Sequence, residues 1–550
     1  MSGLRQALGA ALWHLSDLVR ADERSRSFRA KAYRRAVWSL DDLGPDLAEP
    51  PETMLSVPGI GPGVLKLIEE FRSSGRIAQL ERLEGQYPHD VARLRRLPRM
   101  TPALLRSLKG ELGVEVTADL IAAVESGGVT TLRGVGSPTA ERWARILELA
   151  PSPEAVPAYQ AAVLADSLRR HLFRHLGAET QIAGQLRRTD EWVDLIELIA
   201  EVGDFETAMS FLEETAVARL EGHTDRPGVS LRTHEGMSAH VHLAAPGRSG
   251  ALLLEKTGPP GHTEPLLADI HDDTLTEVAI YARNGKMWIP PAARELGPDT
   301  AEEVVRMGQI RGDLHLHTDW SPDGRMGLVD VLSGAVDRGY EYVLITDHTS
   351  GLRFGGLDGQ ALSRQREDIE TMRDRFPGLA VMHGAELNIA RDGSLDIDED
   401  GLSLLDMAVA GLHSNFDLDR AEQTDRVLRA MQHPVVRVLA HPTGRRIGIR
   451  PPVELDMEAV IVAASKNQVA LEVNGHQDRL DLSAPLAAEA AAGGAMLVAN
   501  SDAHRLGEMG NIANSVATMQ KAGVGPGLVI NTMPLDRLQA WVSRSGIVFG

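Results

Sequence analysis

The stretch Gly312-Asp313-Leu314-His315-Leu316-His317 decides the fold of the C-terminal part of the chain. It is a short apolar run that ends in two histidines separated by one residue, and residues two apart on a β-strand face the same side. Six more apolar runs follow and alternate with helical stretches, which predicts a parallel α/β barrel or an open sheet. The seven runs are 313–317, 342–348, 379–389, 407–413, 435–441, 469–474 and 496–504.

Each of these runs ends in a side chain that can bind a metal ion. These side chains are His315, His317, His348, Glu386, His413, His441, Asn474, Asp502 and His504. Because catalytic groups of a β/α barrel gather at the carboxyl ends of its strands, the positions favour a barrel with a metal site at its mouth. A lone histidine is more often structural than a ligand, and His383, His433 and His476 keep that interpretation.

The composition limits the available chemistry. The chain has 550 residues, 43% hydrophobic and 24% charged, which indicates a globular protein of several domains. No apolar run reaches the roughly 18 to 20 residues that span a bilayer, and the first 20 residues do not resemble a signal peptide, so we expect no membrane association and a cytoplasmic location. The chain has no cysteine, which leaves histidines and carboxylates as metal ligands, a set that suits Mn²⁺, Fe²⁺ or Zn²⁺.

The first 150 residues contain three short segments that are typical of turns between helices. The clearest is Leu-Ser-Val-Pro-Gly-Ile-Gly-Pro-Gly-Val at 55–64, and weaker copies lie at 97–102 and 132–138. Glycine permits positive φ and leaves backbone N–H groups free for a DNA phosphate, although one such hairpin alone could be a plain turn. The predicted DNA-binding residues are Gly59, Gly61, Gly63, Arg95, Arg96, Arg99, Gly134 and Gly136.

The charge distribution agrees with DNA contact in this region. The whole chain has a net charge of −20, yet residues 1–150 hold 21 Lys and Arg against 19 Asp and Glu. Contact with a polyanion is therefore expected mainly in the N-terminal third.

The histidine motifs resemble the PHP (polymerase and histidinol phosphatase) domain, a distorted seven-stranded β/α barrel with a trinuclear metal centre. The resemblance rests on segments 312–318, 345–348, 384–386, 440–445 and 500–504, together with Asp323 and His413. It implies nine ligands: His315, His317, Asp323, His348, Glu386, His413, His441, Asp502 and His504. Glu386 would bridge two of the three ions.

By this resemblance, the first ion would be held by His315, His317, Glu386 and Asp502, the second by Glu386, His413 and His441, and the third by Asp323, His348 and His504. The expected ions are Mn²⁺ or Zn²⁺, with Fe²⁺ also possible. The predicted catalytic residues are Glu386, Asp502, His413, Arg353 and Arg445, where the arginines would hold phosphate. Arg446 and Arg479 are further candidates for that role.

The order of parts resembles the bacterial family X DNA polymerases that carry a C-terminal PHP domain. Segment 28–36 resembles the start of their small N-terminal domain, and 184–188 their nucleotide-binding turn. The predicted fold is therefore multidomain: a helix-hairpin-helix region at 1–88, a second helical domain with hairpins at 89–150, an α/β polymerase-like body at 151–300 and a PHP barrel at 311–550. Within the body we expect a β-rich segment at 278–282, and a linker at 289–305.

The polymerase-like body departs from the family where catalysis would occur. The family holds Mg²⁺ with aspartates, whereas the matching positions here are Leu195, Glu197 and, on a later strand, Val241. The serine of the nucleotide-binding turn is replaced by Gln185. We therefore expect no polymerase activity.

The leading hypothesis is a metal-dependent DNA phosphoesterase of DNA repair that acts at 3′ ends, gaps or damaged sites, binds DNA as a monomer and contains an inactive polymerase-like body. A small-molecule phosphomonoesterase of the PHP type and a non-catalytic DNA-binding scaffold are the alternatives. The scaffold is disfavoured because the metal ligands are intact while the polymerase aspartates are not.

Overall fold

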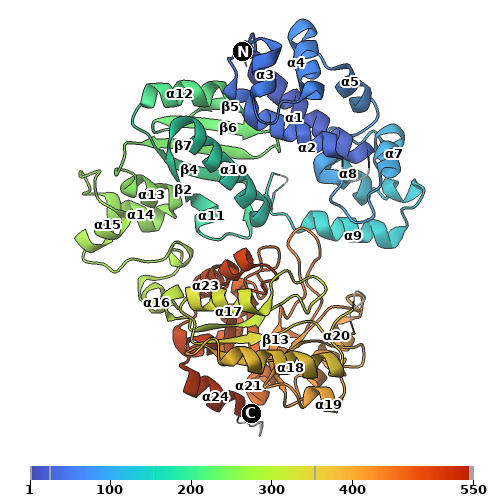
Figure 1. Cartoon of the computed structure of the whole chain (residues 1–550), viewed down its shortest axis with the longest axis vertical. Coiled ribbons are helices and arrows are strands. Elements are labelled where there is room, and N and C mark those ends of the chain that lie inside the picture. Colours follow the sequence, from blue (N-terminus) through green and yellow to red (C-terminus); the bar gives the residue numbers. More distant parts are fainter. Residues whose placement is uncertain (1–2, 24–26, 153, 352–354, 544–550) are drawn as a thin grey trace. The chain divides into compact units, whose positions relative to one another are not determined.

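The chain forms two compact units, Met1–Lys286 and Met287–Gly550 (Figure 1). The computed structural model describes residues 3–23, 27–152, 154–351 and 355–543. Among the helices of these residues, none is long and apolar enough to cross a membrane. The finer division into four domains remains a prediction.

The first part of the N-terminal unit is entirely helical, as expected. In α1 the side chains of Leu8, Leu12, Leu15 and Val19 are buried at helical spacing. The helices are α1 (Leu4–Asp22), α2 (Phe28–Ser39), α3 (Pro51–Ser56), α4 (Pro62–Ser74), α5 (Ala78–Glu84), α6 (Val91–Leu94), α7 (Pro102–Leu112), α8 (Thr117–Glu125) and α9 (Ser137–Glu148), with 3₁₀ turns η1 (Leu40–Asp42) and η2 (Gly128–Thr131).

The second part of this unit is a five-stranded sheet of order β2-β4-β7-β6-β5, in which only β4 and β7 run parallel. The strands are β2 (Glu179–Ala183), β4 (Leu195–Glu201), β5 (Ala218–His223), β6 (Gly228–Thr233) and β7 (Ser238–Ala244), and β1 (Val156–Pro157) pairs separately with β3 (Trp192–Val193). The helices are α10 (Ala158–Leu176), α11 (Gly184–Arg187), α12 (Phe205–Glu214), α13 (Gly250–Thr257), α14 (Pro260–Leu267) and α15 (Glu277–Arg283).

A buried carboxylate ties the helical part to the sheet within the N-terminal unit. The Asp41 side chain is fully buried, with Oδ1 lying 3.1 Å from Nε of Arg5 on α1. Its Oδ2 lies 2.8 Å from Nε2 of His171 on α10 and accepts from the Thr215 hydroxyl, and its Oδ1 accepts from the Ala216 N–H. Elements far apart in sequence therefore share one polar anchor.

The C-terminal unit is the predicted barrel, and all seven predicted runs form its strands. They are β8 (Gly312–Leu316), β9 (Tyr342–Ile345), β10 (Ala380–His383) continued by β11 (Glu386–Asn388), β12 (Ala408–Gly411), β13 (Val436–Ala440), β14 (Ala470–Asn474) and β15 (Leu497–Asn500). Neighbouring strands pair in parallel along the series. The ring closes where Leu316 bridges Ala503 and the His317 N–H donates to the Ala503 carbonyl at 3.0 Å.

Helices surround this barrel, as the alternating pattern predicted. They are α16 (Pro298–Glu303), α17 (Leu328–Asp337), α18 (Gly359–Arg373), α19 (Glu399–Leu402), α20 (Arg420–Ala430), α21 (Met457–Asn467), α22 (Ala484–Ala492), α23 (Ile512–Lys521) and α24 (Leu535–Ser543). One core lies between helices and strands, and Leu344, Val409, Val438 and Val498 belong to a second core that includes Trp541 of α24. The predicted fold class is confirmed.

Two local predictions are wrong. Residues 278–282 form helix α15, because the Thr276 side chain caps its first turn by accepting from the Ala279 N–H, and Ile280 and Tyr281 are buried. The predicted linker 289–305 belongs to the compact C-terminal unit, where Ile289, Val304 and Val305 are buried. Its prolines cap or begin short helical turns and do not mark a free linker.

Candidate metal centre

The nine predicted ligands gather at the carboxyl ends of the barrel strands. His315 lies on β8, Glu386 starts β11, and the other strand-end ligands lie one to four residues after the ends of their strands. Asp323 comes from the loop after β8. The buried members are His315, His317, His348, Glu386, His441 and Asp502, while Asp323, His413 and His504 are half-buried.

Glu386 lies at the middle of the cluster and presents its two oxygens to different histidines. Its Oε2 atom lies 3.4 Å from Nε2 of His315 and 3.5 Å from Nε2 of His317. Its Oε1 atom lies 2.9 Å from Nε2 of His413 and 2.8 Å from Nε2 of His441. Oε2 also lies 2.9 Å from Nδ1 of His348. One carboxylate therefore faces five imidazoles, three through Oε2 and two through Oε1.

Two further carboxylates extend the cluster on either side. Oδ1 of Asp502 lies 3.6 Å from Nε2 of His315 and 3.3 Å from Nε2 of His317. Oδ2 of Asp323 lies 3.6 Å from Nε2 of His348 and 3.5 Å from Nε2 of His504. These contacts bring the nine predicted residues into one continuous centre.

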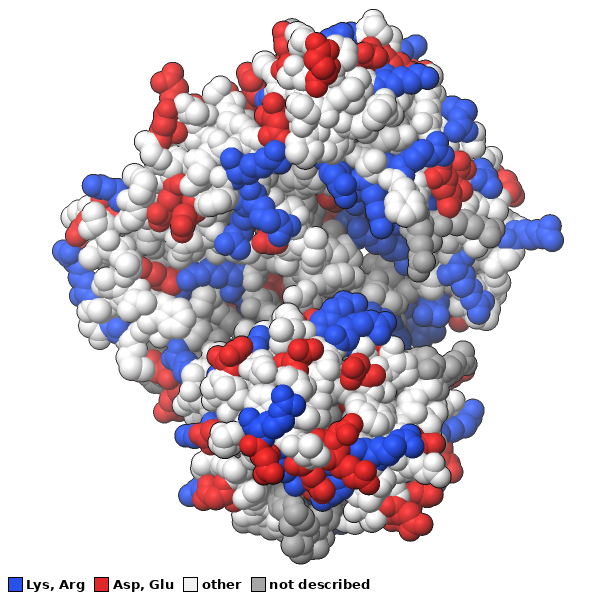
Figure 2. All heavy atoms as spheres, viewed as in Figure 1, with Lys and Arg blue, Asp and Glu red and all other residues white. Residues whose placement is uncertain are grey.

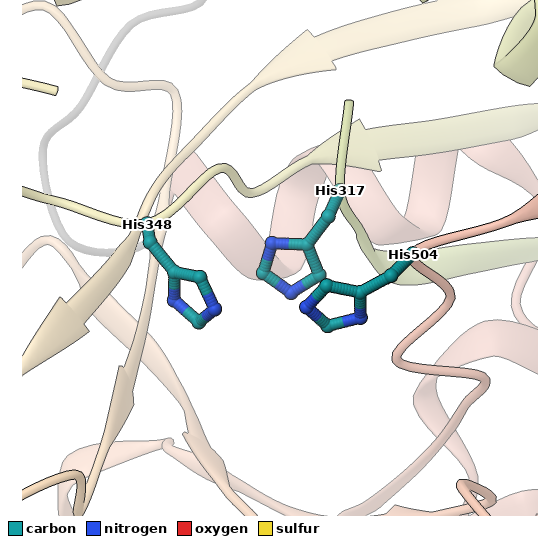
Figure 3. Close-up of side chains that lie close together, drawn as sticks. All are labelled: His317, His348 and His504. Carbon is teal, nitrogen blue, oxygen red and sulfur yellow. The ribbon is translucent and has the colours of Figure 1, made fainter. Parts of the chain in front are cut away.

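Figure 3 shows three histidine rings converging from separate strand ends. The ring centres of His317 and His504 are 4.1 Å apart and those of His317 and His348 are 4.4 Å apart. Protonated imidazoles at such distances would repel one another, so a shared cation is the natural partner for their lone pairs. His317, His348 and His504 offer nitrogens that all lie within 4.8 Å of one another.

The electrostatics keep the carboxylates ionised. Burial raises the pKa of Glu386, but the histidines, led by His413, His348 and His315, outweigh it and hold that pKa well below its ordinary value. Burial likewise lowers the pKa of His441 to about 4 despite its contact with Glu386. At His441, an anionic carboxylate therefore lies beside a neutral imidazole, which is the protonation state that metal binding requires. At His315 and His348, burial is outweighed by the nearby carboxylates, which raise the pKa of the imidazole.

Several nitrogens in the centre are buried without a hydrogen-bond partner. Among the described residues, Nε2 of His315, Nε2 of His317 and both ring nitrogens of His413 have none. Buried polar atoms without partners are costly, and a cation would satisfy them. The clusters of histidine and carboxylate side chains can therefore hold divalent metal ions.

Glu472 on β14 is a buried residue of the centre that the sequence analysis missed. Its Oε1 lies 2.7 Å from Nδ1 of His315 and accepts from Asn500 at 2.9 Å, and its Oε2 accepts from the His441 N–H at 2.7 Å. It therefore orients two ligands, as outer-shell carboxylates of metal-bound histidines do. A signal was present, because Glu472 lies two residues before Asn474 and so faces the same side of its strand.

The loop that carries Asp323 is held by another buried carboxylate. Asp347 accepts from the Thr318 N–H at 2.7 Å, from the Thr318 hydroxyl at 2.6 Å and from the Ser321 hydroxyl at 2.7 Å. These bonds fix the chain between His317 and Asp323.

Space and backbone geometry at the centre are restricted. A Cβ atom on Gly411 would lie 2.9 Å from Cε1 of both His413 and His441 and 3.0 Å from Oε1 of Glu386, so no side chain fits there. His441 and Asp502 have φ values of 28° and 53°. Non-glycine residues at positive φ are strained, and such strain is concentrated at functional sites.

The predicted phosphate-holding arginines differ in their placement. Arg353 lies outside the described residues. Arg445 donates to the Leu480 carbonyl. Arg479 contacts one of the ligands directly: its Nε lies 3.3 Å from Oδ2 of Asp502. Within the described chain, its buried Nη1 has no hydrogen-bond partner.

The three predicted hairpins share one backbone geometry. In each, a residue at positive φ lies two residues before the start or cap of the next helix: Gly59 at 104°, Arg99 at 62° and Gly134 at 94°. The following residue closes a turn, with Ile60 N–H bonded to Val57 and Met100 N–H bonded to Leu97. Gly61 and Gly136 cap α4 and α9, and Gly63 lies in the first turn of α4.

Positive charge gathers beside the second hairpin. Arg20, Arg95 and Thr101 line one surface cavity, and burial together with the charges of Arg34, Arg95 and Arg96 lowers the pKa of Arg20. Figure 2 shows Lys and Arg side chains gathered in patches on the N-terminal unit. The arrangement suits an anionic partner.

The polymerase-like sheet differs from the predicted alignment at one strand. Val241 is buried in the core of the N-terminal unit, and its partner on β4 is Leu198. The residue paired with Glu197 is His240. The side chains beside Glu197 are therefore histidines, and Val241 lies on the opposite face.

Known proteins are similar to this chain both in its N-terminal helical region and over most of its length. The helix-hairpin-helix domain family matches residues 6–77. The chain is 30% identical over 548 residues to the DNA polymerase/3′-5′ exonuclease PolX of Bacillus subtilis, covering 94% of this chain and 96% of that protein. A probable phosphatase of Edwardsiella ictaluri is 30% identical over 244 residues, which cover 41% of this chain and 93% of the phosphatase.

A solved structure of histidinol phosphate phosphatase from Lactococcus lactis, in complex with zinc, L-histidinol and phosphate, covers 39% of this chain and 94% of its own at 17% identity. Its TM-score of 0.31 is too low to carry an argument. The identity with PolX spans nearly the full length of both proteins, and the chain therefore belongs to the bacterial family X DNA polymerases represented by PolX.

Proposed function

We propose that this protein is a metal-dependent DNA phosphoesterase that hydrolyses phosphoester bonds of DNA at 3′ ends, gaps or damaged sites. The observation that carries the proposal is the position of Glu386, whose two oxygens face the pair His315 and His317 and the pair His413 and His441. A phosphoester is the substrate class that such a multi-carboxylate, multi-imidazole centre suits.

We assign the nine ligands to three ions as the family resemblance implies, and contacts within each group support this assignment, while the contact of His348 with Glu386 joins the third group to the others. His315, His317, Glu386 and Asp502 would hold the first ion, Glu386, His413 and His441 the second, and Asp323, His348 and His504 the third. Mn²⁺ and Zn²⁺, or else Fe²⁺, suit this donor set. When bound, such ions supply Lewis-acid activation of water and of the phosphate oxygens.

The protein's own side chains would position the substrate. Arg479 contacts Asp502 through Nε, and its buried Nη1, which has no hydrogen-bond partner among the described residues, would donate to a phosphate oxygen. Arg445 and Arg353 remain predicted contributors. Glu472 would keep His315 oriented.

DNA is the proposed substrate because of the N-terminal unit. The hairpins at Gly59, Arg99 and Gly134 share the tight turn before a helix that suits backbone contact with a DNA phosphate, and the neighbouring arginines Arg95 and Arg96 add charge. The name of the similar PolX includes 3′-5′ exonuclease, which supports the choice of 3′ ends.

We further propose that the polymerase-like body, residues 151–300, does not polymerise nucleotides. Leu195 offers no oxygen ligand, and the neighbours of Glu197 are imidazoles, which Mg²⁺ rarely selects. Primer extension on gapped DNA tests this directly. We expect no incorporation, and extension that disappears in Glu197→Ala would contradict the proposal.

The decisive assay uses 5′-labelled single-stranded, gapped, abasic and 3′-phosphate DNA with Mn²⁺, with and without a chelator. We expect chelator-sensitive product from at least one substrate. A chain that hydrolyses p-nitrophenyl phosphate but none of these DNAs would instead be a small-molecule phosphomonoesterase, the activity class suggested by the probable phosphatase relative. Binding of DNA without hydrolysis of any phosphoester would indicate a scaffold.

A further inference from the structure

A second cluster of potential metal ligands lies in the N-terminal unit. Glu197 on β4 and His240 and His242 on β7 offer ligand atoms that all lie within 4.8 Å of one another. The two strands are adjacent and parallel, with Glu197 paired to His240 and Ile199 paired to His242. Since alternate strand residues share a face, the three side chains project from the same side of the sheet.

The distances suit a bound ion better than direct hydrogen bonds. Oε1 of Glu197 lies 3.5 Å from Nε2 of His242 and 3.8 Å from Nδ1 of His240. Ligand atoms at bonds of about 2.0–2.2 Å in a tetrahedral zinc site lie roughly 3.3–3.6 Å apart. The 3.5 Å distance to His242 lies in this range and the 3.8 Å distance to His240 lies just beyond it. The carboxylate–imidazole distances around Asp502 and Asp323, 3.3 to 3.6 Å, also lie in this range.

His242 supplies an independent indication of a missing partner. Its side chain is 1% exposed, and neither ring nitrogen has a hydrogen-bond partner among the described residues. An imidazole that is buried without a hydrogen-bond partner has lost its hydrogen bonds to water and gained none in return, which reduces the stability of the folded state. A cation at the cluster would satisfy the nitrogen that faces Glu197.

The surroundings hold Glu197 in place and in its anionic form. A Cβ atom on Gly184, whose φ is 60°, would lie 2.9 Å from Oε2 of Glu197, so the glycine backbone packs directly on the carboxylate. Burial raises the pKa of Glu197, but contact with His240 and His242 outweighs it and lowers that pKa to about 2.

We propose that Glu197, His240 and His242 form a transition-metal site in the N-terminal unit, with Zn²⁺ as the best-fitting ion. Two imidazoles and one carboxylate are a known zinc donor set that leaves a fourth position for water. Mg²⁺ fits poorly because it prefers oxygen ligands in octahedral geometry. The His240 side chain is 31% exposed, so the ion has access from solvent.

The test compares zinc bound per full-length chain after loading and removal of excess metal, measured by elemental analysis. His240→Ala and Glu197→Gln should each bind about one ion fewer than the wild type. His223→Ala is the matched control: this exposed histidine of the same unit contacts Glu213 and should keep the full zinc content. A large excess of Mg²⁺ during loading should not displace the ion.

The same comparison in a Glu386→Gln background separates this site from the proposed C-terminal centre. The double variant Glu386→Gln/His240→Ala should bind about one zinc ion fewer than the single variant Glu386→Gln. This difference is expected however many ions the barrel still binds. Circular dichroism checks that each variant is folded, and Glu197→Gln preserves side-chain volume if His240→Ala does not fold. Equal zinc content in the wild type and the folded variants would overturn the proposal.

Discussion

Nδ1 of His315 lies 2.7 Å from Oε1 of Glu472, and both side chains are fully buried. The carboxylate fixes which ring nitrogen of His315 faces Glu386 and Asp502. Glu472 also accepts from Asn474, Asn500 and the His441 backbone. It is therefore a positioning residue for the proposed centre.

Glu472→Gln should lower metal affinity and phosphoesterase activity by about 10- to 100-fold, because outer-shell partners of metal-bound histidines contribute that much. The measurement is activity against Mn²⁺ concentration. A positioning role predicts partial rescue at high Mn²⁺, and an unchanged metal dependence would contradict it.

Gly411→Ala should also impair the centre, because its Cβ would lie 2.9 Å from both His413 and His441. We expect loss of bound metal and at least a tenfold fall in activity while DNA binding persists. Gly507→Ala is the matched control, since nothing lies within 4 Å of its new Cβ. Equal metal content in the two variants would contradict the geometry.

The triple variant Arg95→Ala/Arg96→Ala/Arg99→Ala should bind DNA more weakly and with a smaller salt dependence. Each lost phosphate contact lowers the slope of log affinity against log salt by about 0.9. The comparison is Arg170→Ala, which removes an exposed arginine that pairs with Asp166 on α10. If both variants bind DNA alike at every salt concentration, the hairpin arginines do not contact phosphate.

Asp41→Ala should destabilise the N-terminal unit by about 3–5 kcal/mol at neutral pH, because it leaves Arg5 and His171 buried without their anion. Burial raises the pKa of Asp41, but its bonds to His171, Thr215 and Ala216 outweigh that effect and keep the pKa below its ordinary value of 3.8. A carboxyl with a lowered folded pKa contributes stability above pH 3.8 and loses it as the pH falls further.

Urea unfolding at several pH values measures this contribution. The difference between wild type and Asp41→Ala should be constant near neutral pH and shrink below pH 3.8. Asp166→Ala, which removes an exposed carboxylate paired with Arg170, should have little effect at any pH. A small, pH-independent effect of Asp41→Ala would show that the anchor adds little stability.

The barrel could be predicted because its signal is periodic. Each strand is a buried apolar run followed by a polar residue, as in Val409 to His413, and the pattern locates both the sheet and its functional edge. The nine ligands were found by position together with a family resemblance. The distances between the ligands, and the contacts of the two Glu386 oxygens with different histidines, depend on closure of the barrel. No single segment of the sequence encodes that closure.

The missed features share a physical cause. The role of Gly411 depends on three ligands from three strands meeting above its backbone. Val241 was aligned to a catalytic position, but strand pairing places His240 beside Glu197. Residues 278–282 are apolar enough for a strand, yet a threonine cap and the neighbouring packing make them helical.

The most direct test of the account is the hydrolysis rate of Glu386→Gln on 3′-end DNA in Mn²⁺, measured beside DNA affinity. Glutamine keeps the shape of Glu386 but removes the charge that faces both histidine pairs. We predict a fall in rate of at least roughly 100-fold, comparable to the loss of a key electrostatic contact, with unchanged DNA binding. Hydrolysis at the wild-type rate would contradict the metal centre as the catalytic site.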